Sequence, residues 1–409
     1  MRRVAVTGFG VVSPLGAGRE AFFDSLAAGR SGIGHITRFD CDTFAVRLAG
    51  EVREPLDLPN EVARAARADA KIGFAWAAFG EAMRSAGLER LGGSTLLHLG
   101  TSLETFDLDR IPQGGALDAR SLVEDGEALQ TPLSETVSLL VRSFGRPALF
   151  LTNCSACAAS AQAIGHGFAS VRSGRFETAV CGGFDSMVNP LGIGGFQLLG
   201  ALTADNDRGI SACRPFDASR SGTVLGEGAA VLVLEPLEKA RAAGKTIFAE
   251  VCGYGSSLDA HGLSAPDPEG DGAARAMKSA LDDARLEPGR IEHINTHGTG
   301  TRLNDEIEAV AIRRVFKGSW ERIPVSSTKA LTGHLIGAAG AIEAGACLFA
   351  FARGLVPPNP FLARVAPGCE LFHAGEVARP FAGEYVLSNS FGFGGQNACL
   401  VFRRADGRP

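Results

Sequence analysis

The sequence lacks several features that would point to particular partners. It contains only two Trp and two Tyr, so it offers few aromatic platforms for a ligand. Its formal net charge is -5, and it has no long run of Lys or Arg. A nucleic acid or an anionic membrane surface as the main partner would call for such a basic run. We therefore expect no nucleic-acid partner and no membrane partner.

The chain also lacks an uninterrupted apolar segment of membrane-spanning length. Its longest small and apolar segment, 337–352, contains Glu343 and falls short of the ~20 residues that a transmembrane helix needs. Residues 1–8 carry two arginines but no sustained apolar region and no small-residue cleavage site, which is typical of a first strand. Nine cysteines, an odd number, fit reduced thiols better than a disulfide framework. These observations predict a cytoplasmic protein.

Glycine and small apolar residues are abundant instead. The chain has 53 Gly among 409 residues and is 45% hydrophobic, which favours tight turns and close packing of the backbone. Its length exceeds the ~250–300 residues at which a single hydrophobic core stops growing. We expect two domains or two fused halves.

The chain is organised around a cysteine pair, Cys154 and Cys157. The apolar run 148–151 predicts a strand before the pair, and the Ala- and Gly-rich segment after it predicts a buried helix that ends at Ser173-Gly174. Cys157 is expected at the helix start, where the partial positive charge of the helix end lowers the pKa of a thiol. Two other interpretations stay open: a small buried hydrophobic residue, or a redox pair with C-x-x-C spacing.

Other segments predict elements around this centre. Residues 61–87 predict one amphipathic helix with arginines on one face, and residues 96–100 predict a short buried strand. Residues 101–147 are irregular and predict a cap or interface excursion, and residues 190–196 predict a Gly-rich loop.

Three local patterns occur twice: a strand followed by Gly-aromatic-Gly, a helix of small residues that ends in a basic residue before Gly, and a closing strand. The pairs are 4–10 with 248–255, 157–174 with 334–354, and 226–234 with 394–402. They predict an α/β fold built by duplication, with halves at 1–245 and 246–409. If the two helix starts meet at a pseudo-twofold axis, His334 should lie near Cys157.

Two more residues complete a candidate site. His297 stands where a strand enters a Gly-rich loop, and Lys329 stands just before His334. Catalytic residues commonly sit in such loops, although a lone histidine there is usually structural. The thiol, two histidines and the lysine together favour a catalytic site.

With these motifs the sequence resembles the β-ketoacyl-[acyl carrier protein] synthases of the elongating class, which belong to the thiolase superfamily. The resemblance covers essentially the whole chain. Its motifs are 155–160 around Cys157, 297–301 followed by Asp305 and Glu308, 329–334 followed by Glu343, and 389–397. It implies a thiolase-like five-layered αβαβα fold, and a homodimer or a heterodimer with a chain-length-factor-like subunit.

The resemblance also implies a decarboxylative Claisen condensation that needs no metal and no cofactor, with substrates carried on the phosphopantetheine of an acyl carrier protein. Cys157 would take up the acyl group, and His297 and His334, as neutral imidazoles, would donate hydrogen bonds to the enolate. Lys329 would support the histidines electrostatically. The backbone N–H groups of Cys157 and Phe393 would form the oxyanion hole, and Phe393 would gate access.

The resemblance assigns further roles to substrate-binding, supporting and carrier-docking positions. These are Thr299, Thr301, Leu103, Phe196 and Phe391 for the substrate, Asp305, Glu308 and Glu343 as supporting residues, and Arg64 and Arg67 for the carrier protein. A purely structural ion pair between Lys329 and Glu308 is an alternative of equal weight. Glu343 is expected to be a structural partner.

Departures from the family pattern suggest specialisation. Glu104 and Thr105 replace glycines at the mouth of the acyl pocket, and Gly200 and Ala204 stand where basic carrier-docking residues are expected. We expect a polyketide or polyene enzyme rather than the housekeeping fatty acid enzyme. A non-catalytic partner subunit is the alternative, although such subunits lack the nucleophile that Cys157 provides. Starter-type synthases have Asn in place of the second histidine, and thiolases need a second C-terminal cysteine.

Overall fold

The computed structural model describes residues 1–103, 105–106, 130–131 and 133–405. Outside these residues lie Glu104, for which the sequence analysis made a prediction, and most of the segment 101–147, which it predicted to be irregular.

Two sets of five strands share one order and one pattern of orientations, antiparallel, antiparallel, parallel and parallel. The first set is β1 (Val4–Ser13), β10 (Leu225–Pro236), β9 (Thr178–Ser186), β5 (Thr95–Gly100) and β8 (Leu149–Asn153). The second set is β11 (Ala249–Leu258), β17 (Gln396–Arg403), β16 (Tyr385–Gly392), β12 (His293–Asn295) and β13 (Val325–Ser326). β1 and β11 pair antiparallel and join the two sets. The predicted duplication is confirmed.

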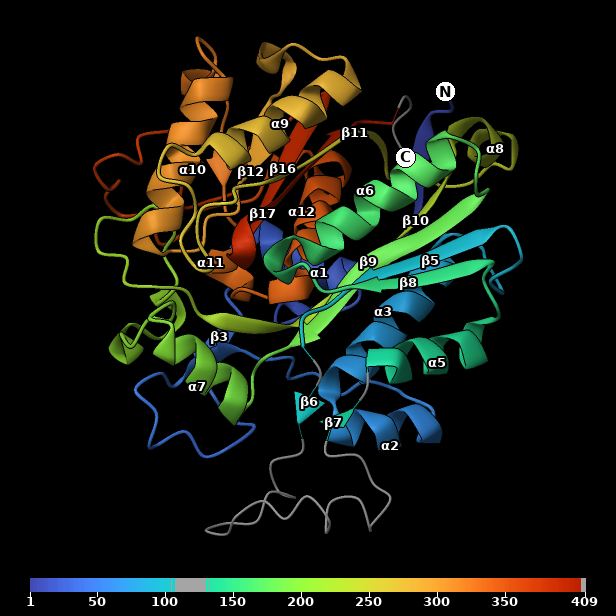
Figure 1. Cartoon of the computed structure of the whole chain (residues 1–409), viewed down its shortest axis with the longest axis horizontal. Helices are drawn as coiled ribbons and strands as arrows, with labels where there is room; N and C mark the ends of the chain where they lie inside the picture. The colour runs from blue at the N-terminus through green and yellow to red at the C-terminus, as the bar shows by residue number, and fades with distance from the viewer. Residues whose placement is uncertain (104, 107–129, 132, 406–409) are drawn as a thin grey trace.

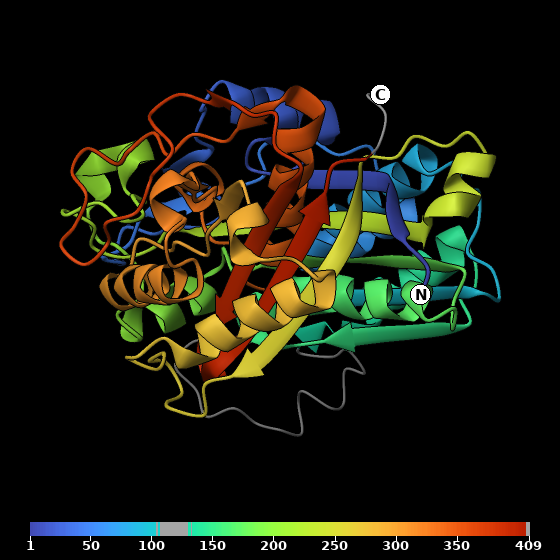
Figure 2. The ribbon, with the colours of Figure 1, turned by 90° about the horizontal axis from the view of Figure 1, so that it is seen from above.

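Three helical layers enclose the strands. The layers are α2 (Asn60–Ala68), α3 (Ala70–Ser85) and α5 (Leu133–Phe144) outside the first set, α6 (Ala159–Arg172) and α12 (Ala339–Arg353) between the sets, and α9 (Asp271–Ala284) and α10 (Arg302–Val315) outside the second. Figure 1 shows this succession from α9 and α10 at the top to α2 at the bottom. Figure 2 shows α9 lying along β11 and β17. The five-layered α/β fold is therefore confirmed.

The remaining elements connect these layers or extend their edges. They are β2 (Gly16–Ala17), α1 (Arg19–Ala27), β3 (Ile33–His35), β4 (Leu48–Gly50), β6 (Thr105–Phe106), β7 (Gln130–Thr131), α7 (Pro190–Leu198), α8 (Leu237–Ala242), α11 (Lys329–Thr332), β14 (Leu355–Val356) and β15 (Arg379–Pro380).

The middle layer explains why both central helices are rich in small residues. A Cβ at Gly340 of α12 would lie 2.8 Å from the Cβ of Ala161 in α6, so no larger side chain fits there. The Ser160 hydroxyl accepts a hydrogen bond of 3.0 Å from the Ala341 N–H across this contact. The segment Ile336–Arg353 is long and apolar enough for a membrane span, but 89% of it is buried inside the protein, as expected of a core helix.

Three local predictions are wrong. The helix predicted at 61–87 is two helices, because Asp69 leaves the helical conformation (φ -145°, ψ 102°) and caps α3. The loop predicted at 190–196 is α7, which Asn189 caps by accepting the Gly192 N–H at 2.9 Å. The C-terminal part of the irregular segment is α5, whose apolar face packs on α3.

Candidate active site

The nucleophile candidate lies in a tight turn that occurs in both halves. Cys157 is the middle residue of a 3-10 turn, Ala156–Ala158, that runs directly into α6. An equivalent turn, Ile336–Ala338, precedes α12. The first residue of each turn has a positive φ, 48° at Ala156 and 44° at Ile336. The duplicated turn brings the two helix starts together and leaves the Cys157 side chain 4% exposed.

His334 reaches Cys157 from the second half, as the duplication predicted. Its Nε2 lies 3.1 Å from the Cys157 Sγ. Its Nδ1 accepts a hydrogen bond of 3.2 Å from the Ile336 N–H. In a neutral imidazole, the nitrogen that accepts this bond carries no proton, so Nε2 carries it. His334 therefore presents an N–H group toward the sulfur.

His297 is held in the same tautomer by Lys329. The Lys329 Nζ lies 3.3 Å from the His297 Nδ1 and donates a hydrogen bond of 2.5 Å to its carbonyl oxygen. The two imidazole rings lie 5.3 Å apart at 81°. Burial, with the charge of Lys329 as a further cause, holds the pKa of both His297 and His334 well below the ordinary value. Both rings are therefore neutral hydrogen-bond donors at pH 7.

Lys329 pairs with Glu343 and not with Glu308. The Lys329–Glu343 ion pair is fully buried, and the Ser390 hydroxyl donates to the other Glu343 oxygen at 3.3 Å. Glu308 accepts hydrogen bonds of 2.8 Å from the N–H groups of His297 and Gly298. The alternative of a Lys329–Glu308 pair is wrong, and Glu343 supplies the counter-charge for the lysine.

The loop that carries His297 is tied to the start of α10. Asp305 accepts the N–H groups of Thr299 at 3.1 Å, Gly300 at 3.2 Å and Phe216 at 2.7 Å. Burial raises the pKa of Asp305, and it raises the pKa of Glu308 to about 7. These two carboxyl groups therefore satisfy the backbone of the loop and fix the position of the His297 ring.

The pKa of the Cys157 thiol departs from the expectation. Burial raises it to about 12, against the lowering effects of Lys329 and of the Phe393 backbone N–H. The turn at a helix start was expected to lower this pKa, but the largest effect on it is the loss of solvation on burial, which raises it. The resting sulfur is therefore a thiol at neutral pH.

The loop after β16 closes over the sulfur. The Phe393 backbone N–H interacts with the Cys157 thiol, and the Phe393 ring lies 6.0 Å from the Phe196 ring. Gly394 and Gly395 follow with φ of 75° and 74°, a conformation that favours glycine. The Phe393 loop thus puts an N–H donor and an aromatic ring beside the nucleophile.

A cavity of about 440 Å³ leads from the surface to these groups. Cys157, His297 and His334 lie at its buried end, and the Thr299 and Thr301 hydroxyls, 2.8 Å apart, line it further out. The predicted substrate-binding residues Phe196 and Phe391 and the predicted gate Phe393 also line it. Leu103, Arg64 and Arg67 do not: Leu103 is 61% exposed, and the two arginines are exposed on α2.

The sulfur and the two imidazoles also form a possible metal-binding set, since their ligand atoms lie within 4.8 Å of one another. A metal-bound histidine needs a lone pair on the ligating nitrogen, and its other nitrogen normally donates a hydrogen bond. Here the other nitrogen of His334 accepts a bond from Ile336, and that of His297 faces Lys329. The arrangement suits donation to an anion rather than binding of a metal. Cys154 is exposed, and neither Cys154 nor Cys157 forms a disulfide.

Two buried residues near the site were missed at the sequence level. Asp185, at the end of β9, accepts the Gly337 N–H at 2.7 Å and the Ser102 hydroxyl at 2.8 Å, and burial raises its pKa to about 6. The Lys71 side chain, 2% exposed, donates to the Leu103 carbonyl at 2.5 Å. An acidic residue that ends an apolar strand was a signal for Asp185.

Comparison with known proteins covers nearly the whole chain. The family model "Beta-ketoacyl synthase, N-terminal domain" matches residues 1–240, and "Beta-ketoacyl synthase, C-terminal domain" matches residues 248–362. A 3-oxoacyl-[acyl-carrier-protein] synthase 2 from Synechocystis sp. is 37% identical over 415 residues, which cover 98% of each chain.

Two solved structures are also similar. The ishigamide ketosynthase/chain length factor has 34% identity and a TM-score of 0.86, over 99% of this chain and 100% of that chain. The AntDE ketosynthase, in complex with the type II PKS acyl-carrier protein AntF, has 28% identity and a TM-score of 0.86 over the same shares.

Proposed function

Because this chain belongs to the β-ketoacyl synthase family and is a 3-oxoacyl-[acyl-carrier-protein] synthase, we propose how its buried residues divide the condensation. The observation that carries the proposal is the 3.1 Å contact between Cys157 and His334, beside a second imidazole that is also a neutral donor. Cys157 takes up the acyl group, and His297 and His334 stabilise the anions of the decarboxylation step. Lys329 holds His297 in the required tautomer and is neutralised by Glu343.

The transfer of the acyl group does not require Cys157 to be a thiolate before the acyl donor arrives. The Cys157 S–H bond breaks as the sulfur attacks the thioester carbonyl, and the bond from that carbonyl to the pantetheine sulfur then breaks. The proton passes to the departing pantetheine sulfur, so no proton is gained or lost overall. The N–H groups of Cys157 and Phe393 stabilise the tetrahedral oxyanion. A pKa of about 12 for the resting thiol is compatible with this exchange.

The second substrate, a malonyl thioester on the carrier protein, then loses carbon dioxide. The electron pair of the broken C–C bond forms an enolate, whose oxygen accepts the N–H groups of His297 and His334. The enolate carbon attacks the acyl-Cys157 carbonyl and forms the new C–C bond. Cys157 leaves as thiolate and takes one proton from water, which balances the reaction.

The experiment that tests these roles is intact-protein mass measurement after incubation with a panel of acyl carrier protein thioesters. An acyl adduct on the wild-type chain that is absent from Cys157→Ala is the expected result. An adduct that persists in Cys157→Ala would contradict the assignment of the nucleophile. A chain that forms no adduct with any donor, alone or with a partner subunit, would support the alternative of a non-catalytic subunit.

We further propose that the substrate comes from a specialised polyketide or polyene pathway. Leu103 precedes the positions at which Glu104 and Thr105 replace glycines, and the Leu103 backbone is bound by the buried Lys71. The ishigamide and AntDE ketosynthases support this direction, whereas the Synechocystis synthase supports fatty acid elongation as the alternative. Efficient elongation of ordinary fatty acyl carrier substrates by the purified chain, without a partner, would contradict the specialised role.

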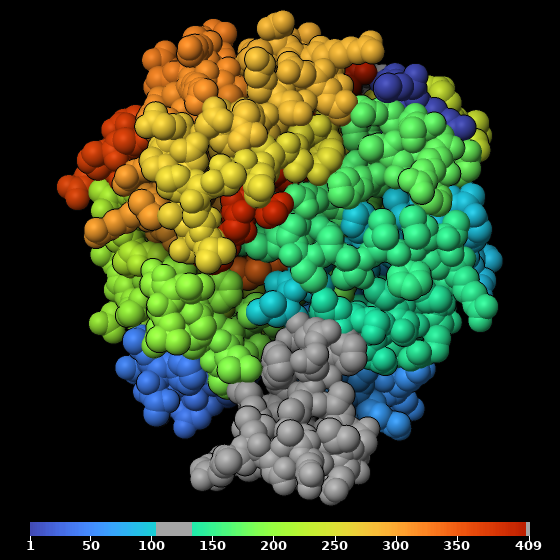
Figure 3. Space-filling view, in the orientation of Figure 1, coloured from blue at the N-terminus to red at the C-terminus, as the bar shows by residue number. Residues whose placement is uncertain are grey.

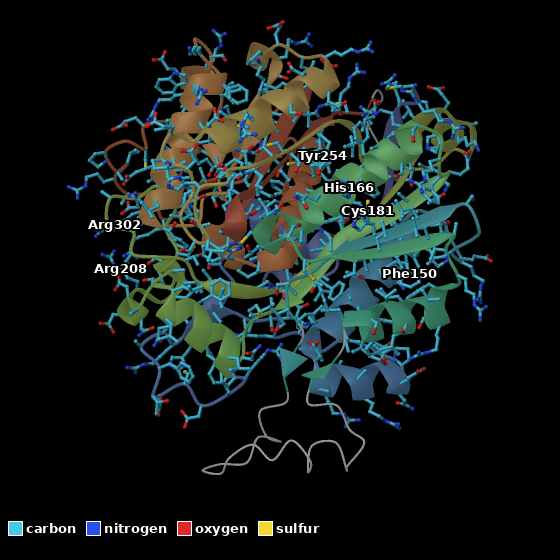
Figure 4. All side chains as sticks on the ribbon, in the orientation of Figure 1. Phe150, His166, Cys181, Arg208, Tyr254 and Arg302 are labelled. Carbon is cyan, nitrogen blue, oxygen red and sulfur yellow. The ribbon has the colours of Figure 1, made fainter. Side chains whose placement is uncertain are left out.

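A dimer fits the exposed edge of the sheet. β8 is the last strand of its set, and its Phe150 and Leu151 are 57% and 41% exposed. Figure 4 labels Phe150 beside this strand. An unpaired apolar edge favours pairing with a second chain. We propose a homodimer, or a heterodimer with a chain-length-factor-like subunit, through this edge. Replacing Phe150 with Lys should shift the mass in solution to that of a monomer.

Other predictions stay proposals. The units of the duplication are 1–245 and 246–409, with the boundary between α8 and β11. Arg64 and Arg67, which are exposed on α2, are proposed as additional contacts for the carrier protein. The chain is proposed to act in the cytoplasm, where its nine cysteines stay reduced.

A further inference from the structure

The mouth of the catalytic cavity is surrounded by unusually exposed leucines. Leu198 and Leu263 are each 89% exposed, and Leu199 and Leu303 are each 57% exposed. Leu199, Leu263 and Leu303 line the cavity, and Leu198 adjoins Leu199 at the end of α7. We call these four residues the leucine rim.

The leucine rim is assembled from three segments that are distant in the sequence. Leu198 ends α7 and Leu199 follows it, Leu263 lies in the loop after β11, and Leu303 lies in the first turn of α10. The Gly394 N–H donates a hydrogen bond of 2.7 Å to the Leu263 carbonyl, so this loop is bound to the Phe393 loop. Figure 3 shows the red C-terminal segment reaching the surface between yellow and green segments.

Exposed apolar groups that converge on one place mark a contact surface more often than scattered ones do. Single exposed leucines are common, but here each of the three segments contributes one or two to the edge of the same cavity. Any substrate arm that reaches Cys157 through this cavity must cross the leucine rim. The protein that carries the arm is then brought against these side chains.

Among the residues that the structure describes, positive charge around the mouth is sparse. Gly200 lines the cavity where a basic docking residue was expected. Arg208 lies at the same edge of the molecule as Arg302 (Figure 4), but it pairs with Asp205 at 3.3 Å. Arg302 is exposed and lines the cavity. In the described part of the chain, the mouth thus offers an apolar surface with one prominent cation, Arg302, rather than a basic patch.

We propose that the leucine rim is the main docking surface for the acyl carrier protein, which binds it through an apolar helix face. The inference rests on the proposed function, since it takes the cavity as the entrance for the carrier-bound arm. Apolar contact is not screened by salt, so the affinity for the carrier protein changes little with ionic strength. Docking through α2 arginines would instead weaken steeply as salt rises.

The test compares Leu263→Ser and Leu303→Ser with Val377→Ser, a matched control that is 74% exposed and does not line the cavity. The probe is the acyl carrier protein that gives the wild-type chain its highest condensation rate. Each rim variant should raise the KM for this carrier protein about 3- to 10-fold with kcat kept, as expected for a contact residue. Small acyl pantetheine thioesters should show a much smaller change, and Val377→Ser should change neither value.

Binding of the fluorescent apo carrier protein, followed by anisotropy, gives a second readout that needs no chemistry. The Kd should rise in both rim variants and change less than about threefold in the wild type between about 0.05 and about 0.5 M salt. Unchanged KM and Kd in both rim variants would overturn the proposal. So would a steep salt dependence with larger losses in Arg64→Ala and Arg67→Ala. Leucine-dependent binding without condensation would support the docking surface and contradict the proposed function.

Discussion

The Nζ of Lys329 lies 3.3 Å from the Nδ1 of His297, so a buried ammonium group sets the tautomer of a buried imidazole. Glu343 forms a fully buried ion pair with this lysine and supplies its counter-charge. The same contact lowers the pKa of His297, in addition to the larger effect of burial. The lysine therefore controls which nitrogen of His297 carries the proton that the reaction uses.

Removing this lysine should separate the two steps of the reaction. Lys329→Ala alone would leave Glu343 as an unpaired buried charge, which destabilises the fold. We therefore expect the double variant Lys329→Ala with Glu343→Gln to fold, to acylate Cys157, and to decarboxylate malonyl carrier protein about 100-fold more slowly. Acylation is read by intact mass and decarboxylation by release of carbon dioxide. A double variant with normal decarboxylation would show that the ion pair is only structural.

Replacement of His334 by Asn should lower the condensation rate less than replacement by Ala. His334→Asn keeps an N–H donor, whereas His334→Ala removes it, so the alanine variant should lose about 10²- to 10³-fold in rate and the asparagine variant less. Condensation rates with one acyl donor and one malonyl donor measure the difference. Equal losses in the two variants would mean that the ring acts through something other than hydrogen-bond donation to the substrate.

The sequence predicted the duplicated fold and the meeting of Cys157 with His334 because both depend on repeated local patterns. Small residues and glycines recur at the same places in each half, and each place has a packing reason, such as the contact between Gly340 and Ala161. Because the chain repeats one α/β unit, the strands of the second half have the same order as those of the first half. The separation of His334 Nε2 and Cys157 Sγ, 3.1 Å, agrees with that reasoning.

The sequence did not predict which of these side chains are buried. The helix dipole that was expected to lower the Cys157 pKa is local, whereas the desolvation that raises it depends on the packing of both halves. Lys71 lies in a segment that looks like a solvated helix face, yet its side chain is 2% exposed. The break at Asp69 was missed for the same reason, because that residue caps α3 next to this buried lysine.

Glu308 should make the stability of the protein fall between about pH 4.5 and pH 7. Burial raises its folded-state pKa from 4.5 to about 7, so the folded chain binds this proton more tightly than the unfolded chain. The favourable contribution is complete below pH 4.5 and is lost as the pH rises through about 7, by up to a few kcal/mol. Urea unfolding of the wild type and of Glu308→Gln at several pH values measures the slope. The slope should be smaller in Glu308→Gln, and an unchanged slope would show that another group is responsible.

Alkylation by iodoacetamide should show whether burial, which raises the pKa of the Cys157 thiol, outweighs the helix start and the Lys329 charge, which lower it. The thiolate is the reactive form, so a thiol whose pKa burial raises to about 12 should react ever faster as the pH rises from 6 to 9, without a plateau. Intact mass of the substrate-free protein, with Cys157→Ala as the blank, gives the rate at each pH. Cys154→Ser removes the exposed thiol nearby and leaves the Cys157 signal isolated. A plateau near pH 7 would mean that the helix start and the Lys329 charge outweigh burial, and that a thiolate is already present before the acyl donor arrives.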